Sequence, residues 1–307
     1  MLTKLILAVD PPQSYPKTTT EEDITFLLDK AWEIRFQEPD SAIQLLNKAD
    51  SLAQIIADTS SQITAYIRKG AIFTSNGNWE MGETLFGRAL KLSTTTGDSI
   101  AQIRALINLG QLYQQNGSFD KATQALFKSI RLLEGTDLHN YKKVAYSTIG
   151  SIYISLNKNQ DAIDIYKQLL NESKIISDRS GMNQACYNLG VSYFNADSLQ
   201  KALFYLDQSI VISKELSDSM HLAQSYNLLG SIHFIQENYS LAISYLEKAL
   251  PIAQRWGMHS EQASILNNLG SVFEHTEKWA SATKIYLQAA QLLSLIHISE
   301  PTRRPII

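Results

Sequence analysis

The sequence has one cysteine, few prolines in its middle and no long hydrophobic run. Cys186 is the only cysteine, so a disulfide framework within the chain is excluded. It falls at an apolar helix position, and we therefore expect a buried, inert thiol. Seven prolines are present, but none lies between residues 40 and 250. Because proline breaks helices, its absence over this distance favours long helices.

Excess charge of one sign is also lacking. The net charge of −3 gives no electrostatic footprint for nucleic acid or an anionic membrane, and we expect neither as a partner. No stretch approaches the ~20 apolar residues of a membrane span. The apolar run at residues 5–9 is shorter than the ~7–15 residues typical of a secretory signal, and Asp10 follows it. We expect a cytoplasmic protein; the alternative is a periplasmic protein whose signal peptide is truncated.

Motifs for catalysis or cofactor binding are absent as well. The chain has no phosphate-binding glycine loop, no zinc-protease helix motif and no serine-nucleophile elbow. Its six histidines lie far apart in sequence, without metal-ligand spacing. We expect His233 to pack in the core and His221 to be exposed. The sequence predicts no catalytic residue, no metal site and no cofactor, and therefore a protein that is not an enzyme.

What the chain does have is an internal repeat of forty residues. Its most regular marker is a glycine that recurs at this spacing. The six glycines are Gly70, Gly110, Gly150, Gly190, Gly230 and Gly270. An aromatic residue, including one histidine, follows each glycine by three positions, and a small residue follows it by twelve. A period of this size predicts a stacked array of supersecondary units.

Each unit reads as a first helix A, a short turn and a second helix B. In one repeat, helix A is expected over residues 99–115, the turn over residues 116–118, and helix B from Phe119. The corresponding turns of the other repeats are predicted at residues 76–78, 157–159, 196–198, 236–238 and 276–278. Aspartates recur just before helix A and are predicted to cap its free amides. These aspartates are Asp58, Asp98, Asp178 and Asp218.

A glycine inside a helix needs a reason, because it costs about 1 kcal/mol relative to alanine. We expect the missing side chain to let helix B approach closely. The small residue twelve positions later is the expected partner at this crossing. Aromatic residues three and sixteen positions later are expected to fill the space on either side; those at the latter position are Phe86, Tyr166 and Tyr286.

The motif LG-x2-Y followed by A-x3-F or A-x3-Y resembles the tetratricopeptide repeat. It is seen in Leu109-Gly110 with Tyr113, in Leu189-Gly190 with Tyr193, and in Ala162 with Tyr166. The resemblance implies an all-α, right-handed superhelical solenoid of about seven helix-turn-helix repeats. The period of forty, without the usual terminating proline, resembles the long-repeat branch found in kinesin light chains, polarity adaptors with GoLoco partners, and bacterial peptide-sensing regulators.

The repeats divide the chain into three parts. Residues 1–22 are expected to form a flexible tail, residues 23–294 the solenoid, and residues 295–307 a non-native tail with two prolines that interrupt the pattern. The native protein would then continue beyond residue 294. The repeat boundaries are expected at residues 23–62, 63–102, 103–142, 143–182, 183–222, 223–262 and 263–294.

The A helices of stacked hairpins line the concave surface, where a ligand would bind. Asparagine recurs there, although it is a mediocre helix former. Its amide both donates and accepts hydrogen bonds, which suits the backbone of an extended peptide. In long-repeat relatives, the resemblance implies, asparagine at this position grips peptide backbone; the alternative is that it bonds to the neighbouring repeat. The predicted groove residues are Asn108, Asn188, Asn268, Asn227, Asn267, Arg68, Arg104, Gln184 and Gln224.

These observations predict a non-catalytic scaffold that binds a protein or peptide segment in the concave groove and is able to form a homodimer. The alternative is a sensory or dimerisation module of a bacterial signalling protein, a histidine kinase or transcriptional regulator, whose effector domain is missing from this chain. A third interpretation is a structural spacer without a ligand.

Overall fold

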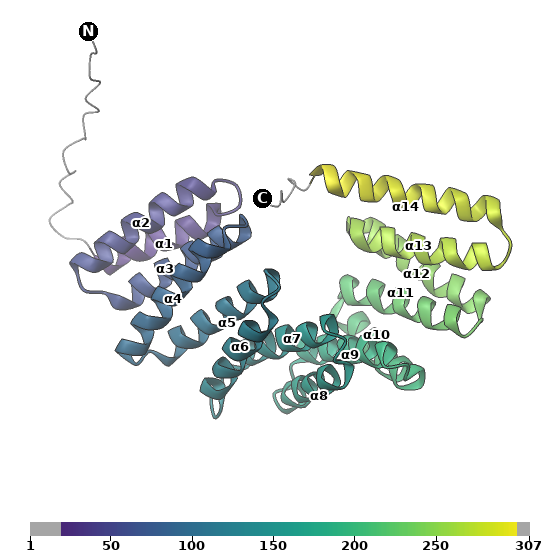
Figure 1. Ribbon diagram of the computed structural model, residues 1–307, viewed down its shortest axis with the longest axis horizontal. Helices are drawn as coiled ribbons and strands as arrows, with labels where there is room; N and C mark the ends of the chain where they lie inside the picture. The colour runs from purple at the N-terminus through teal and green to yellow at the C-terminus, as the bar shows by residue number, and fades with distance from the viewer. Residues whose placement is uncertain (1–19, 300–307) are drawn as a thin grey trace, which may run out of the picture. The chain divides into compact units, whose positions relative to one another are not determined.

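The structure is a computed structural model that describes residues 20–299, and in this range it contains fourteen helices and no strand. The helices pair into seven hairpins of an A helix and a B helix (Figure 1). The predicted all-α fold of about seven helix-turn-helix repeats is therefore confirmed. The helices are α1 (Glu21–Ile34), α2 (Pro39–Ile55), α3 (Thr59–Ser75), α4 (Trp79–Thr96), α5 (Ser99–Gln115), α6 (Phe119–Leu133), α7 (His139–Ser155), α8 (Asn159–Ile175), α9 (Arg179–Asn195), α10 (Leu199–Leu216), α11 (Ser219–Ile235), α12 (Tyr239–Arg255), α13 (His259–His275) and α14 (Trp279–Ser299).

The turns inside the hairpins lie where the sequence predicts them, with one exception. Five of the six predicted turns match the helix ends. The exception is the turn after α7, which covers residues 156–158 because α8 begins at Asn159. The central residue of each such turn adopts a left-handed conformation, and here that residue is Asn157, with φ of 55°. The prediction of residues 157–159 was therefore wrong by one position.

Three of the four predicted aspartate caps are present. Asp58 accepts a hydrogen bond from the Ser61 amide at 3.1 Å, and Asp98 and Asp218 cap α5 and α11 in the same way. Asp178 makes no cap bond of this geometry to α9. Burial acts to raise the pKa of its carboxyl, but hydrogen bonds from the Gly181 and Ser180 amides in the first turn of α9 and from Lys143 hold that pKa below its usual value. Its carboxylate accepts from the Lys143 ammonium at 2.9 Å, so it links α9 to α7.

The chain divides into two compact units, Met1–Leu112 and Tyr113–Ile307, and α5 spans their boundary. Within each unit, consecutive A helices contact one another: α1 with α3 in the first unit, and α7 with α9, α9 with α11 and α11 with α13 in the second. Neighbouring B helices make no comparable contact among the described residues of either unit. The A helices of each unit therefore form a contiguous layer, here called the inner layer.

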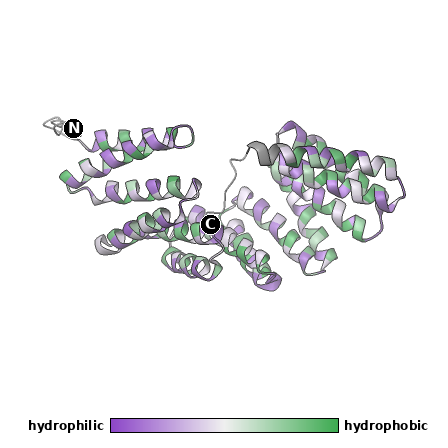
Figure 2. Ribbon diagram, turned by 45° about the horizontal axis from the view of Figure 1, so that its top comes forward, coloured by the Kyte–Doolittle hydropathy of each residue, from purple (hydrophilic) through white to green (hydrophobic). Residues whose placement is uncertain are grey.

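Each hairpin buries the apolar side of both helices. Figure 2 shows that hydrophobic and hydrophilic residues are mixed along every helix, as expected for helices with one buried side. In the second unit, Tyr166, Leu189 and Leu206 belong to one core cluster that runs from α8 to α11. In the first unit, Ile24 and Leu46 belong to the corresponding cluster of α1, α2 and α3.

The repeated glycines are sites of close helix packing, but the partner differs from the prediction. A Cβ atom at Gly70 would lie 2.6 Å from the ring of Phe86, and one at Gly150 would lie 2.4 Å from Tyr166. The side chain sixteen positions later therefore lies directly over the glycine, whereas the small residue at twelve positions was the expected partner. The small residue still permits the approach, because a Cβ at Gly190 would lie 3.6 Å from the Ala202 carbonyl oxygen.

At the ends of the described range, Thr20 caps α1 with a hydrogen bond from Asp23 to its hydroxyl. The last helix continues to Ser299, past residue 295, where the predicted tail begins. The remaining predicted tail segments, residues 1–19 and 300–307, lie outside the described residues, and the domain boundaries stay predictions. None of the helices described between residues 20 and 299 has both the length and the apolar character that a bilayer crossing requires.

Candidate functional site

The candidate site is the inner layer of the second unit, defined as helices α7, α9, α11 and α13. Six of the nine predicted groove residues lie on it. Gln184 and Asn188 are on α9, Gln224 and Asn227 are on α11, and Asn267 and Asn268 are on α13. The other three, Arg68, Arg104 and Asn108, belong to the first unit.

In the first unit, two of the three predicted residues contact their own surroundings. The Arg68 guanidinium lies 3.1 Å from a carboxylate oxygen of Asp29 and 5.6 Å from the ring centroid of Trp32, which ties α3 to α1. The Asn108 amide donates to the backbone carbonyl of Arg104 at 2.8 Å, within its own helix. The side chain of Arg104 is half-buried and makes no hydrogen bond or ion pair with the part of the chain that is described.

In the second unit, Asn227 and Asn268 bond to the neighbouring repeat. The buried Asn227 amide donates to Glu261 at 2.8 Å and to Ser264 at 3.1 Å. The Asn268 amide donates to the Asn227 side-chain oxygen at 2.7 Å and to Ser231 at 3.1 Å. These two asparagines match the alternative interpretation of the asparagine pattern, because they hold α13 against α11.

Three other amides of the inner layer remain available. Gln184, Asn188 and Gln224 are each half-buried. Their side chains make no hydrogen bond with any residue in the described range 20–299. Asn267 is likewise without such a bond, but its side chain is exposed. The structure thus brings three uncommitted amides together on two adjacent A helices, α9 and α11.

Two further residues of the inner layer, Glu261 and Tyr187, were not selected from the sequence. Glu261 is half-buried, and burial raises the pKa of its carboxyl, opposed by the hydrogen bond from Asn227. Burial, together with the charge of Glu261, raises the pKa of the Tyr187 phenol to about 12, so the phenol is neutral at physiological pH. Glu261 could not be selected from the sequence, because an acidic residue in the first turn of a helix is expected from the helix dipole alone.

Two histidines of α11 were predicted from the sequence, and one prediction is confirmed while the other was wrong. His233 packs as predicted, stacked on Tyr245 with ring centroids 5.3 Å apart. His221 was expected to be exposed, but its ring is half-buried, with Nδ1 2.6 Å from the Asp218 carboxylate and its edge against Tyr187. The cause is the cap of α11, because the aspartate that caps this helix lies three residues before His221 and draws in the ring.

Behind this ring is a buried polar cluster between α9, α10 and α11. Asn183 is fully buried, and its amide donates to Ser213 at 2.9 Å and to Asp218 at 3.0 Å. Its oxygen accepts from Ser209 at 2.8 Å. Because each polar atom has a partner, the cluster specifies how the hairpins stack and does not offer a vacant binding site.

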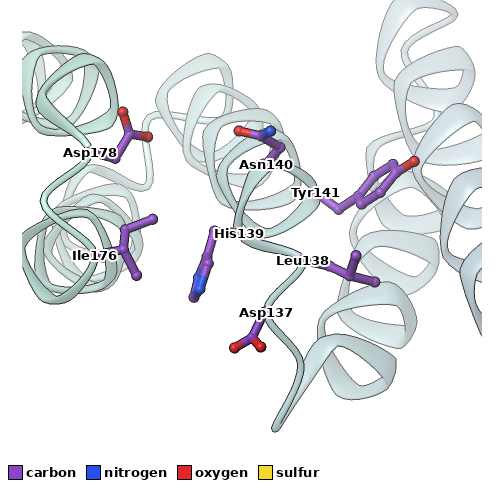
Figure 3. Close-up of a pocket in the computed structure, with 7 residues that line it drawn as sticks. All are labelled: Asp137, Leu138, His139, Asn140, Tyr141, Ile176 and Asp178. Atoms are coloured by element: carbon purple, nitrogen blue, oxygen red, sulfur yellow. The ribbon is translucent and has the colours of Figure 1, made fainter.

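A pocket of about 370 Å³ lies at the amino-terminal end of α7. Figure 3 shows its seven lining side chains, which come from residues 137–141 at the start of α7 and from Ile176 and Asp178 on the facing segment. Leu138 stands at the position that an aspartate holds in four other repeats, and α7 has no side-chain cap. None of the predicted groove residues lines this pocket.

The structure also shows the surroundings of the single cysteine and of the side chains that could bind a metal ion. Cys186 is buried, and burial raises the pKa of its thiol to about 11, so the thiol is protonated at neutral pH. Among the described residues, no three histidine, cysteine, aspartate or glutamate side chains are arranged to hold a metal ion.

Comparison with solved structures finds proteins of the same fold. The apo form of the quorum sensor NprR from B. thuringiensis is 18% identical with a TM-score of 0.69, and the match covers 88% of this chain and 76% of that chain. Aspartyl phosphate phosphatase F from Bacillus subtilis is 12% identical with a TM-score of 0.69, covering 93% of this chain and 74% of that chain. The Rap conjugation gene regulator of the plasmid pLS20, in complex with the Phr* peptide, is 13% identical with a TM-score of 0.59, covering 95% and 82%.

At these identities the likeness shows the fold alone. The fold is generally non-catalytic, but the phosphatase among the similar structures means that it does not by itself exclude catalysis. No curated protein matches the sequence. One family model described as tetratricopeptide repeat matches residues 61–135 and 182–255, and a second with the same description matches residues 145–180. These segments together span more than half of the chain, which therefore belongs to the tetratricopeptide repeat family.

Proposed function

We propose that the protein is a scaffold that binds an extended protein or peptide segment along the inner layer of its second unit. The observation that carries the proposal is the set of uncommitted amides of Gln184, Asn188 and Gln224. A side-chain amide supplies both a donor and an acceptor, which are the two groups that each peptide unit of an extended ligand presents. Half-buried amides without a partner also gain more from a ligand than fully solvated ones.

The asparagines of the layer would then have two different roles. Asn227 and Asn268 hold α11 and α13 together and keep the layer rigid, whereas Asn188 contacts the ligand. A rigid layer reduces the entropy that is lost on binding. Asn267 remains a candidate contact at the periphery of this layer. On the first unit, Arg104 remains a candidate, while Arg68 and Asn108 would first have to give up the bonds that they already make.

The comparisons support the proposal at the level of the fold. One similar structure is a Rap regulator in complex with the Phr* peptide, and another is a quorum sensor. At least one protein of similar fold therefore forms a complex with a peptide. We extend that mode of binding to this chain on the basis of its uncommitted amides, and we assign no catalysis to it.

The proposal is tested with a random decapeptide library whose amino termini are acetylated. The wild-type protein is expected to retain a defined subset of the peptides. A triple Gln184→Ala, Asn188→Ala, Gln224→Ala variant loses several hydrogen bonds of about 1 kcal/mol each, so its affinity for the retained peptides falls at least tenfold. Asn171→Ala is the matched control, because Asn171 is an exposed asparagine on the B helix α8. Circular dichroism checks that the variants are folded. The proposal fails if the wild type retains nothing above background, or if the triple variant and the control bind equally.

A second candidate function is a sensory module of a bacterial signalling protein, with a kinase or DNA-binding effector and a homodimeric state. The likeness to the quorum sensor NprR favours it. The coding sequence downstream of residue 294 in the source genome tests the effector, and light scattering of the protein tests the dimer. A downstream reading frame without an effector domain would count against this candidate.

A further inference from the structure

Glu261 is a half-buried carboxylate of the inner layer that has no cationic partner, whereas two lysines of the same layer are paired. Lys142 pairs with Glu172 at 3.5 Å and Lys143 with Asp178 at 2.9 Å. No lysine, arginine or histidine in the described part of the chain forms an ion pair with Glu261. A carboxylate that is partly removed from water without a counter-charge is unfavourable, and it gains when a cation binds.

The position of this carboxylate is fixed by its neighbours. Asn227 donates to its Oε1 atom at 2.8 Å, and Asn227 is itself held by Ser264 and Asn268. The second oxygen, Oε2, accepts no hydrogen bond from any residue between 20 and 299. A carboxylate has about four acceptor sites, so most of the capacity of Glu261 is unused.

Tyr187 adds an aromatic side chain from a third helix. It lies on α9, and burial, followed by the charge of Glu261 on α13, raises the pKa of its phenol. Among the described residues, Glu261 therefore keeps one free carboxylate oxygen, an amide donor from Asn227 and no cationic partner.

We infer that Glu261, positioned by Asn227, binds a cationic group of the ligand, an ammonium or a guanidinium. The inference rests on the proposed function and adds to it the chemical class of the ligand: a peptide with a basic residue placed opposite α13. The contact is a charge-assisted hydrogen bond to the free oxygen, and a guanidinium is able to donate two such bonds.

A purely structural role would leave a different signature. Glu261 lies in the first turn of α13, where a negative charge is favoured by the helix dipole. In that case its removal would lower stability but would not change which peptides are preferred. The readout that separates the two roles is the charge preference of the bound peptides.

The experiment compares the wild type, Glu261→Gln and Glu261→Asp on the acetylated decapeptide library. Glu247→Gln is the matched control, because Glu247 is an exposed glutamate on α12. The wild type and the control are expected to enrich lysine or arginine at one peptide position. In Glu261→Gln this enrichment is expected to fall about tenfold, because the variant loses one charge-assisted hydrogen bond to the ligand. Glu261→Asp keeps the charge and is expected to retain a weaker preference, which guards against loss of fold in the first variant.

Two further arms sharpen the result. A second library with free amino termini distinguishes a basic side chain from the terminal ammonium as the bound group. Raising the salt concentration with the wild-type protein is expected to weaken the basic preference more than overall retention, because exposed charge pairs are screened. Retention without a basic preference, or an unchanged preference in Glu261→Gln, overturns this inference and leaves peptide binding intact. No retention by the wild type overturns both.

Discussion

The amide of Asn268 donates to the side-chain oxygen of Asn227 across 2.7 Å, and this bond joins α13 to α11. The Asn227 amide in turn donates a hydrogen bond to the Glu261 carboxylate. The asparagine that holds two repeats together is therefore the same residue that positions the free carboxylate. In this layer, the proposed binding surface depends on bonds between repeats, and asparagines in successive repeats make different contacts.

Replacing Asn227 by alanine is expected to destabilise the protein by about 1–3 kcal/mol. The change removes three hydrogen bonds at a buried position and leaves polar partners on α13 unpaired. Asn267→Ala is the control, because the exposed Asn267 side chain makes no such bond and surface changes stay within about 0.5 kcal/mol. Urea denaturation of both variants measures the difference. Equal stability of the two would show that the asparagine network contributes nothing.

Replacing Gly70 by alanine is expected to destabilise the protein by about 1–3 kcal/mol, because the new methyl group would overlap the fully buried ring of Phe86. Gly87 lies in the same hairpin, on the exposed side of α4, and a Cβ there would contact nothing within 4 Å. Gly87→Ala is therefore expected to stabilise by up to about 1 kcal/mol, through helix propensity alone. Thermal unfolding distinguishes them by the sign of the shift in Tm, and shifts of the same sign would contradict the packing argument.

Replacing Lys69 by alanine is expected to cost about 3 kcal/mol or more. Its ammonium lies 3.0 Å from the Asp50 carboxylate, and both side chains are largely buried, so the substitution would leave an unpaired buried charge. The comparison is Lys30→Ala, which removes an exposed pair with Glu33 and is expected to cost less than about 1 kcal/mol. Denaturant midpoints of the two variants measure both costs. A double Lys69→Met, Asp50→Leu variant is expected to recover most of the stability, and a failure to recover would assign the loss to packing.

The fold was predictable because the repeat places equivalent residues in equivalent surroundings. A glycine followed sixteen positions later by a large side chain recurs in hairpin after hairpin, and turn residues such as Asn76 and Gly77 mark the helix ends. The spacing did not reveal which side chain lies over the glycine. Spacing along one chain gives the period, whereas the contact depends on how deeply each side chain reaches across the hairpin.

The candidate site was predictable only in part. The sequence correctly placed Asn188 and Gln224 on the A helices, but it did not distinguish them from Asn227, because that distinction depends on residues some forty positions away. Asn227 is committed by Glu261 and Asn268, on the next repeat. Asp178 illustrates the same limit, since its carboxylate also pairs with a lysine on the preceding A helix, a contact that the position of Asp178 before α9 does not reveal.

The carboxylate of Asp218 is expected to make stability depend on pH in the acid range. Burial acts to raise its pKa, but hydrogen bonds from the ring and backbone of His221, and from Asn183, outweigh burial and hold the pKa below its usual value of 3.8. A lowered pKa in the folded state means that the stabilising contribution is complete above the ordinary aspartate pKa. It is lost as the pH falls below that value and through the folded-state pKa. The wild type should therefore lose stability relative to Asp218→Asn between roughly pH 4 and pH 2, measured by denaturation at a series of pH values. Parallel pH profiles for the two proteins would show that Asp218 is not responsible, and the cap of α11 would then have to be stabilised by groups that do not titrate in this range.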